Sequence, residues 1–262
     1  MLGAIIGDVV GSTYEFNNTK EMDFPLFPEK STFTDDTVLT IATAKAILEG
    51  RKDYDWLYKK YALDYMKCGW GARFAEWARS PEMQPAYNSY GNGSAMRVGP
   101  IGYAFDDIET TLEEARVSAA VTHNHPEGIK GAEAISAAIF LARMGDSKDQ
   151  IKSYIEDRFH YYLDWTIAEI RPTYTFEVSC QGSCPQAIIA FLESENFEDA
   201  IRLAVSLGGD SDTLACMAGA IAEAYYKEVP VEMIEKTWAV LPEDFQKVII
   251  DFYDMKRDKQ DD

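Results

Sequence analysis

The stretch that decides the fold is Phe33–Leu48, FTDDTVLTIATAKAIL, in which two adjacent carboxylates stand directly before an apolar, alanine-rich run. From Val38 onward, apolar residues recur at spacings of three and four, the period of one face of an α-helix. Thr34 is a suitable N-cap, and Asp35 and Asp36 would complement the helix macrodipole in the first turn. Taken alone, the stretch is best explained as a capped helix start, with half of a cation site as the alternative.

The same helical period runs through most of the chain. It covers residues 112–121, 131–143, 186–192, 197–207 and 214–226, and Pro230 and Pro242 are placed to open two C-terminal helices. Alternating strand patterns are nearly absent, and the best is the short stretch 173–178, TYTFEV. No Ser/Gly/Pro-rich linker or solenoid repeat divides the chain. We therefore expect an all-α fold, a compact single-domain helical bundle of about ten or more helices over residues 1–262, with a frayed tail from about residue 256.

Composition excludes several classes of function. The formal net charge of −19 opposes binding to nucleic-acid backbones and to anionic membranes. The four cysteines lack the spacing of a zinc site. The N-terminal region has no basic segment, Asp8 interrupts its apolar run, and no stretch is long and apolar enough to span a bilayer. We expect a cytoplasmic protein without general nucleic-acid or membrane partners, and the sequence leaves its oligomeric state open.

A second acidic stretch changes the interpretation of the first. Residues 208–213, GGDSDT, also precede an apolar run rich in small residues, LACMAGAIAEAYY. A cap needs one oxygen, whereas paired carboxylates near a core are costly without a cation. The donors are all oxygens, which suits Mg²⁺, Mn²⁺ or Ca²⁺ better than zinc. If the two helix starts converge, their four carboxylates would suit two divalent ions roughly 3.5–4 Å apart.

These two motifs, with three others, resemble the ADP-ribosylglycohydrolase family, which includes dinitrogenase-reductase-activating glycohydrolase and the human ADP-ribose-acceptor hydrolases. The motifs occur in the family's order: GDVVG at 7–11 with Glu15-Phe16, FTDDT at 33–37, GNGSAMRVGPIG at 91–102, THNH at 122–125 and LGGDSDT at 207–213. The resemblance implies an all-α hydrolase of the N- or O-glycosidic bond of ADP-ribose, with a binuclear Mg²⁺ or Mn²⁺ centre. The implied metal ligands are Thr34, Asp35, Asp36, Asp210, Asp212 and Thr213.

The resemblance also implies substrate-binding and catalytic residues. The implied substrate-binding residues are Gly69, Gly71, Ser89, Tyr90, Gly91, Asn92, Gly93, Met96 and His123. In the family, the segment at 88–94 cradles the diphosphate and ribose, and His123 would lie beside the diphosphate. Glu15 matches the family's glutamate, so Glu15 or a metal-linked Asp35 is expected to move the proton, with Asp8 bracing the metal site.

Several of these residues also have a structural explanation. Glu15 alone would be a loop acid, and residues 88–94 alone a surface loop. Gly3, Gly7 and Gly11 are expected to permit close helix packing rather than to bind phosphate. Arg97 would either clamp a phosphate or pair with a buried acid. His125 and His160 are expected to be structural, and so are Trp70, Tyr87 and Tyr174, although any of these three aromatic residues could stack on adenine.

The resemblance therefore implies a metal-dependent ADP-ribosylglycohydrolase acting on modified protein side chains, such as arginine or serine, or on small ADP-ribose conjugates. Three alternatives stay open at this point: a non-catalytic ADP-ribose-binding module, a hydrolase of ADP-ribosylated nucleic acid or nucleotide conjugates, and a purely structural helical protein. The motifs decide neither the acceptor nor the choice between Mg²⁺ and Mn²⁺.

Overall fold

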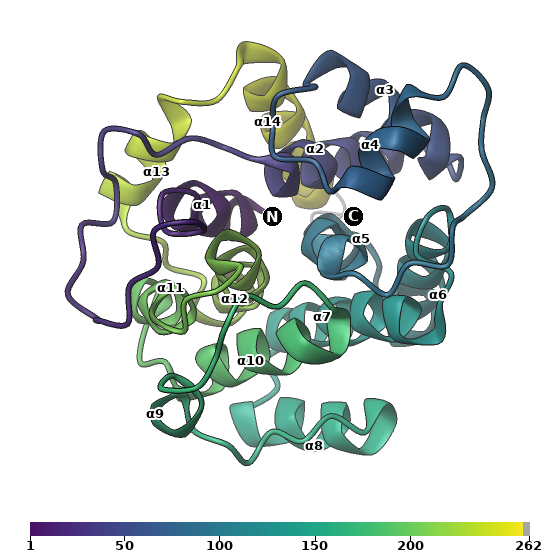
Figure 1. The fold of residues 1–262 in the computed structure, drawn as a ribbon. Coiled ribbons are helices and arrows are strands. Elements are labelled where there is room, and N and C mark those ends of the chain that lie inside the picture. Colours follow the sequence, from purple (N-terminus) through teal and green to yellow (C-terminus); the bar gives the residue numbers. More distant parts are fainter. Residues whose placement is uncertain (259–262) are drawn as a thin grey trace.

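The computed structural model describes residues 1–258, and every named element within them is a helix (Figure 1). The order is α1 (Leu2–Gly11), α2 (Asp35–Leu48), α3 (Tyr54–Asp64), α4 (Ala72–Arg79), η1 (Asn92–Ser94), η2 (Met96–Val98), α5 (Gly99–Ala104), α6 (Ile108–Ala120), α7 (Pro126–Met144), α8 (Lys148–Phe159), α9 (Ile167–Ile170), α10 (Cys180–Glu193), α11 (Phe197–Ser206), α12 (Ser211–Tyr226), α13 (Val231–Trp238) and α14 (Glu243–Asp258). The all-α expectation is confirmed.

Capping residues explain where the helices begin. The Thr34 side chain accepts a hydrogen bond from the Asp36 amide, as expected of the N-cap of α2. Helix α7 begins at Pro126, five residues before the expected 131, because the His125 side chain caps it and proline fits the first turn. Helix α6 begins at Ile108 because Asp107 caps it. The apolar periodicity predicted only the buried face of these helices, whereas the capping residues determine where each helix begins.

One sequence expectation needs correction. Residues 173–178 form no strand, and the only β-pairing among residues 1–258 is an isolated antiparallel bridge between Gly91 and Ser179. Within the predicted tail, Lys256 belongs to α14 and pairs with Asp106. The remainder of the expected tail, residues 259–262, lies outside the described residues.

The centre of the molecule is the pair α1 and α12, which lie side by side (Figure 1). Gly3 faces Gly219, Gly7 faces the carbonyl of Ala215, and Gly11 faces the Cα of Asp212. A Cβ atom at any of these three glycines would overlap the opposite backbone. The glycine spacing of four residues therefore serves close helix packing, and it brings the C-terminal end of α1 against the N-terminal end of α12.

The other helices enclose this pair. Helices α7, α10 and α11 pack against α12, while α2 packs against α1 and carries α3 and α14 on its other sides. The buried side chains form two clusters, the smaller one between α2 and α14. Across residues 1–258, no helix has both the length and the apolar character needed to cross a membrane.

The α1–α12 contact gives a stability prediction. Gly7→Ala should lower the free energy of unfolding by about 3 kcal/mol, because the added methyl group forces two backbones apart. Gly99→Ala is the matched control, since its Cβ would lie 3.6 Å from Ala4, an ordinary contact. Urea unfolding of the two variants measures the difference. A Gly7→Ala protein as stable as Gly99→Ala would contradict this account of the packing.

Candidate active site

Asp8 joins the first two helices at the site. Its carboxylate is fully buried on α1 and accepts hydrogen bonds from the Thr34 amide at 2.9 Å, the Thr34 hydroxyl at 2.7 Å and the Thr37 amide at 3.1 Å. The Thr37 hydroxyl also donates to it. One carboxylate on α1 thereby fixes the N-terminal turn of α2.

The N-terminal turn of α12 is fixed by two other side chains. Gly208 and Gly209 both have positive φ angles, +70° and +72°, and turn the chain into the helix. Asn18 accepts from the Gly209 amide at 2.9 Å and donates to the carbonyls of Gly209 and Glu15. Asn92 donates to Asp210 at 2.6 Å. The loop that carries Glu15 is therefore fastened next to Asp210.

The two helix starts meet at this point. The Thr213 hydroxyl on α12 donates to Asp36 on α2 at 3.2 Å. Two groups of three acids each bring one oxygen per residue within 4.8 Å of one another: Asp8 with Asp36 and Asp212, and Glu15 with Asp210 and Asp212. Asp212 belongs to both groups, so the acids form one continuous cluster.

The chemistry of this cluster fits divalent cations. The Asp36 Oδ1 atom is buried and has no hydrogen-bond partner among the described residues. Burial first, and then neighbouring carboxylates, raise the pKa of Asp36 and of Asp212 well above the usual range. A bound cation would give the orphaned oxygen a partner and offset this repulsion. Oxygen-only donors are those that Mg²⁺, Mn²⁺ and Ca²⁺ prefer.

Asp35 occupies a different position from its neighbour. It lies in neither three-acid group, and its Oδ1 atom faces Gly69, 3.6 Å from where a Cβ would stand. Burial, Asp8 and Asp210 raise the pKa of its carboxyl group well above the usual range. Asp35 therefore shares the electrostatics of the cluster without adding an oxygen to either group.

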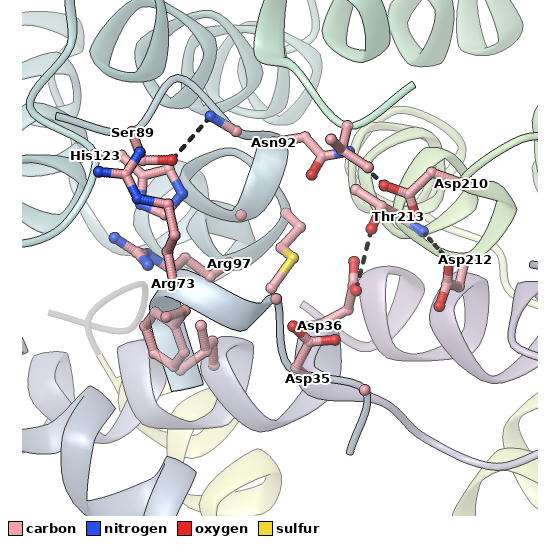
Figure 2. Close-up of a pocket in the computed structure, with 18 of the residues that line it drawn as sticks. Asp35, Asp36, Arg73, Ser89, Asn92, Arg97, His123, Asp210, Asp212 and Thr213 are labelled. Carbon is pink, nitrogen blue, oxygen red and sulfur yellow. Dashed lines mark hydrogen bonds between the residues drawn. The ribbon is translucent and has the colours of Figure 1, made fainter. Parts of the chain in front are cut away.

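A cavity of about 430 Å³ extends from this cluster. Figure 2 shows the acids on one side and Ser89, Arg73, Arg97 and His123 on the other. At the second side, the Nε2 atom of His123 faces Gly91 and Gly93, where added Cβ atoms would lie 3.5 and 3.3 Å away. The segment 91–92 is held in place because the Asn92 amide donates to the Val178 carbonyl at 2.8 Å. One end of the cavity thus carries carboxylates, and the other carries loop backbone and cationic side chains.

Most of the sequence-predicted site residues line this cavity. Those that do are Glu15, Asp35, Asp36, Gly69, Gly71, Ser89, Gly91, Asn92, Gly93, Met96, His123, Asp210, Asp212 and Thr213. Thr34 is not in the lining and contacts the site through Asp8 and Asp36. Tyr90 is not in the lining either; it is half exposed, with its ring against His125.

The three aromatic residues that could stack on adenine differ in whether they line the cavity. Trp70 donates to the Tyr65 carbonyl and stacks on Phe74, and Tyr174 donates to the Gly182 carbonyl, so both have structural contacts. Tyr87 lines the cavity, with the Arg73 guanidinium 4.9 Å from its ring centre.

Several lining residues escaped sequence reasoning. Arg73 was missed, although an arginine directly after the glycines of CGWGARF is a usable signal. Phe176 and Val178 were missed because their alternating pattern suggested a strand. Phe176 is half exposed and stacks on the exposed Phe16, next to Glu15, at 6.1 Å between ring centroids. This exposed aromatic pair borders the acidic end of the cavity.

The sequence is similar to those of known proteins. The family model of ADP-ribosylglycohydrolase matches residues 1–261. The chain is 26% identical to ADP-ribosylhydrolase ARH3 of Homo sapiens, over 95% of this chain and 90% of that protein. It is 25% identical to ADP-ribosylarginine hydrolase Tri1 of Pseudomonas putida (strain GB-1), over 97% of this chain and 76% of that protein.

A solved structure described as an ADP-ribosylglycohydrolase-related protein complex shares the fold. It has a TM-score of 0.75 at 24% identity, and the match covers 97% of this chain and 95% of that one. The match of the family model over almost the whole sequence decides the assignment. The chain is a member of the ADP-ribosylglycohydrolase family.

Proposed function

We propose that this protein is a cation-dependent hydrolase that releases ADP-ribose from a modified side chain or a small conjugate. One observation carries the proposal: a single cavity joins a cluster of oxygen donors to a glycine loop beside His123. The first end suits divalent cations and the hydroxyl groups of a ribose. The second end suits a diphosphate, because backbone amides and basic side chains bind anions.

The residues that would hold the cations are Asp8, Asp36, Asp210 and Asp212, with the Thr213 hydroxyl and the Glu15 carboxyl group beside them. We expect two ions, Mg²⁺ or Mn²⁺. When bound, they would order the distal ribose hydroxyls and favour deprotonation of water. Asn92 keeps Asp210 oriented, and Asp8 keeps the start of α2 in place, so the chain presents its oxygens without rearrangement.

Glu15 is the group best placed to exchange a proton. In the cation-free protein, burial, Asp210 and Asp8 raise the pKa of Glu15 to about 7. A carboxyl group with such a pKa can hold or release a proton near neutral pH. Cleavage of a glycosidic bond passes through an oxocarbenium-like transition state, which needs a protonated leaving group and a deprotonated water. Glu15 would serve one of these transfers, with Asp35 as the second candidate.

The proposal is tested with defined substrates. We expect ADP-ribose release from at least one of ADP-ribosyl-arginine peptide, ADP-ribosyl-serine peptide and O-acetyl-ADP-ribose, in the presence of Mg²⁺ or Mn²⁺. Release should stop with excess chelator and return when the cation is restored. Liquid chromatography of free ADP-ribose measures it. Tight binding of ADP-ribose without its release from any substrate would favour a non-catalytic binding module. Release of ADP-ribose that continues under full chelation would contradict the cation-dependent mechanism.

Glu15→Gln tests the proton transfer. It should lower kcat by about 100-fold or more, because the amide cannot exchange the proton. Cation titrations of both proteins show whether the site still fills, and kcat is compared at saturating cation. Glu21→Gln, on the same loop and exposed, is the matched control. A Glu15→Gln enzyme with nearly normal kcat would remove Glu15 from the mechanism.

The raised carboxyl pKa values predict a pH-dependent response to cations. In the cation-free protein these groups hold protons that the unfolded chain releases, so their contribution to stability is lost as pH rises from about 4 toward neutrality. Cations compete with these protons, so MgCl2 should raise Tm more at about pH 7.5 than at about pH 5. Differential scanning fluorimetry with NaCl at matched ionic strength measures this. Equal Tm shifts at both pH values would contradict the prediction.

A further inference from the structure

Arg97 is a buried cation without an acidic partner. Its side chain is fully buried in η2, and its guanidinium lies 4.2 Å from the centre of the Tyr58 ring. Nη2 donates to the Ser118 carbonyl at 2.8 Å and to the Thr122 hydroxyl at 3.1 Å, while Nε and Nη1 have no partner in the described part of the chain. The sequence left open a pairing with a buried acid, and residues 1–258 provide no such pair. A buried charge of this kind needs an anion nearby.

The Thr122 hydroxyl connects this cation to His123. Thr122 is fully buried, and its Oγ1 atom lies 2.7 Å from His123 Nδ1. Within residues 1–258, the Thr122 hydroxyl has hydrogen bonds only with Arg97 and His123. The opposite edge of the imidazole, which carries Nε2, faces Gly91 and Gly93 at the cavity. Figure 2 shows Arg97 and His123 on the same side of the cavity, away from Asp210 and Asp212.

The hydrogen-bonding capacity of each group decides the direction of this chain. Arginine can only donate, so Thr122 Oγ1 accepts from Arg97. The hydroxyl proton then has one available acceptor, His123 Nδ1. If Nδ1 carried the proton instead, the hydroxyl proton of Thr122 would be buried without an acceptor. The cost of that unpaired donor would make the Nδ1–H tautomer about tenfold or more less populated than the Nε2–H tautomer. A neutral imidazole that accepts at Nδ1 carries its proton at Nε2.

We propose that Arg97 and Thr122 are positioning residues that hold His123 in the Nε2–H form, so that it donates a hydrogen bond to the diphosphate of ADP-ribose. This inference rests on the proposed function for the identity of the anion. Thr122 is fully buried and is not part of the cavity lining, so it acts on the ligand only through His123, whereas Arg97 is fully buried but lies in the lining. Arg97 donates to Thr122, and Thr122 donates to His123. Because both hydrogen bonds point toward the cavity, they polarise the His123 N–H group and strengthen it as a donor to the anion.

The electrostatics agree with a neutral donor at this position. Burial first, and then Arg97 and Arg73, lower the pKa of His123 well below its usual range. In the ligand-free protein the ring therefore stays uncharged through neutral pH, while its hydrogen bond with Thr122 selects the tautomer. A histidine whose charge did not change would give a diphosphate the same hydrogen bond at every working pH.

The direct test is ¹⁵N NMR of the ligand-free protein with labelled histidine. The chain has three histidines, so His125→Gln and His160→Gln variants assign the remaining signal to His123. We expect His123 to show a protonated Nε2 and an unprotonated, hydrogen-bonded Nδ1, unchanged between about pH 5 and about pH 8. A proton on Nδ1, or titration with an ordinary histidine pKa, would overturn the proposal whether or not ADP-ribose binds.

Variants of Thr122 test the link to ligand binding. Thr122→Val removes the hydroxyl and should weaken ADP-ribose binding about five- to tenfold by calorimetry, with loss of the hydrogen-bonded Nδ1 shift. Thr122→Ser keeps the hydroxyl and should restore both properties. Thr111→Val is the matched control, because its buried hydroxyl donates only to the Asp107 carbonyl among residues 1–258.

The outcomes separate this inference from the proposed function. Wild-type affinity in Thr122→Val would overturn the positioning role. If the wild-type protein shows the expected tautomer but does not bind ADP-ribose, the proposed function and the assignment of the anion both fail. If ADP-ribose is bound and hydrolysed but His123 carries the other tautomer, only the present inference fails.

Discussion

The contact between the backbones of α1 and α12 is the constraint on which the rest of the structure depends. Glycines on α1 allow the two helices to approach until their backbones are in direct contact. This approach places Asp8 of α1 beside Asp212 of α12, and Asp8 in turn holds the first turn of α2. Three helix segments that are distant in sequence therefore meet at one cluster of carboxylates. A larger residue at these glycines would separate the oxygens as well as the helices.

Much of this arrangement could be predicted from sequence, because its causes are local. The periodicity of 33–48 and 214–226 predicted the helices, and the paired acids before each of them predicted an oxygen-rich site. The boundaries of α6 and α7 could not be predicted as well, because single caps at Asp107 and His125 extend them beyond their apolar stripes. Alternation at 173–178 suggested a strand, but an isolated strand without a partner has no ladder to join.

The remaining differences concern residues whose roles depend on the fold. Asp8 was expected as a brace, and the structure also places its oxygen in a three-acid group. Arg97 had two open roles: among residues 1–258 it has no acidic partner, and it lies in the cavity lining with Nε and Nη1 unpaired. The sequence gives the type of each residue but not its contacts in the fold. Those contacts determine whether a charged side chain is neutralised by a partner or contributes to the electrostatic potential of the cavity. The two ends of the cavity consequently differ in sign, although the whole chain carries a charge of −19.

The pairing of α1 with α12 also bears on how the protein is made. The first helix has no partner for its glycine face until residues 211–226 have been synthesised, more than 200 residues later. Since chains emerge from the ribosome at roughly 5–20 residues per second, this helix would wait for about ten seconds or more before it can dock. The cluster of carboxylates forms only with that docking. Nascent chains would therefore lack this carboxylate cluster until residues 211–226 have been synthesised, so one long-range contact both joins α1 to α12 and assembles the cluster.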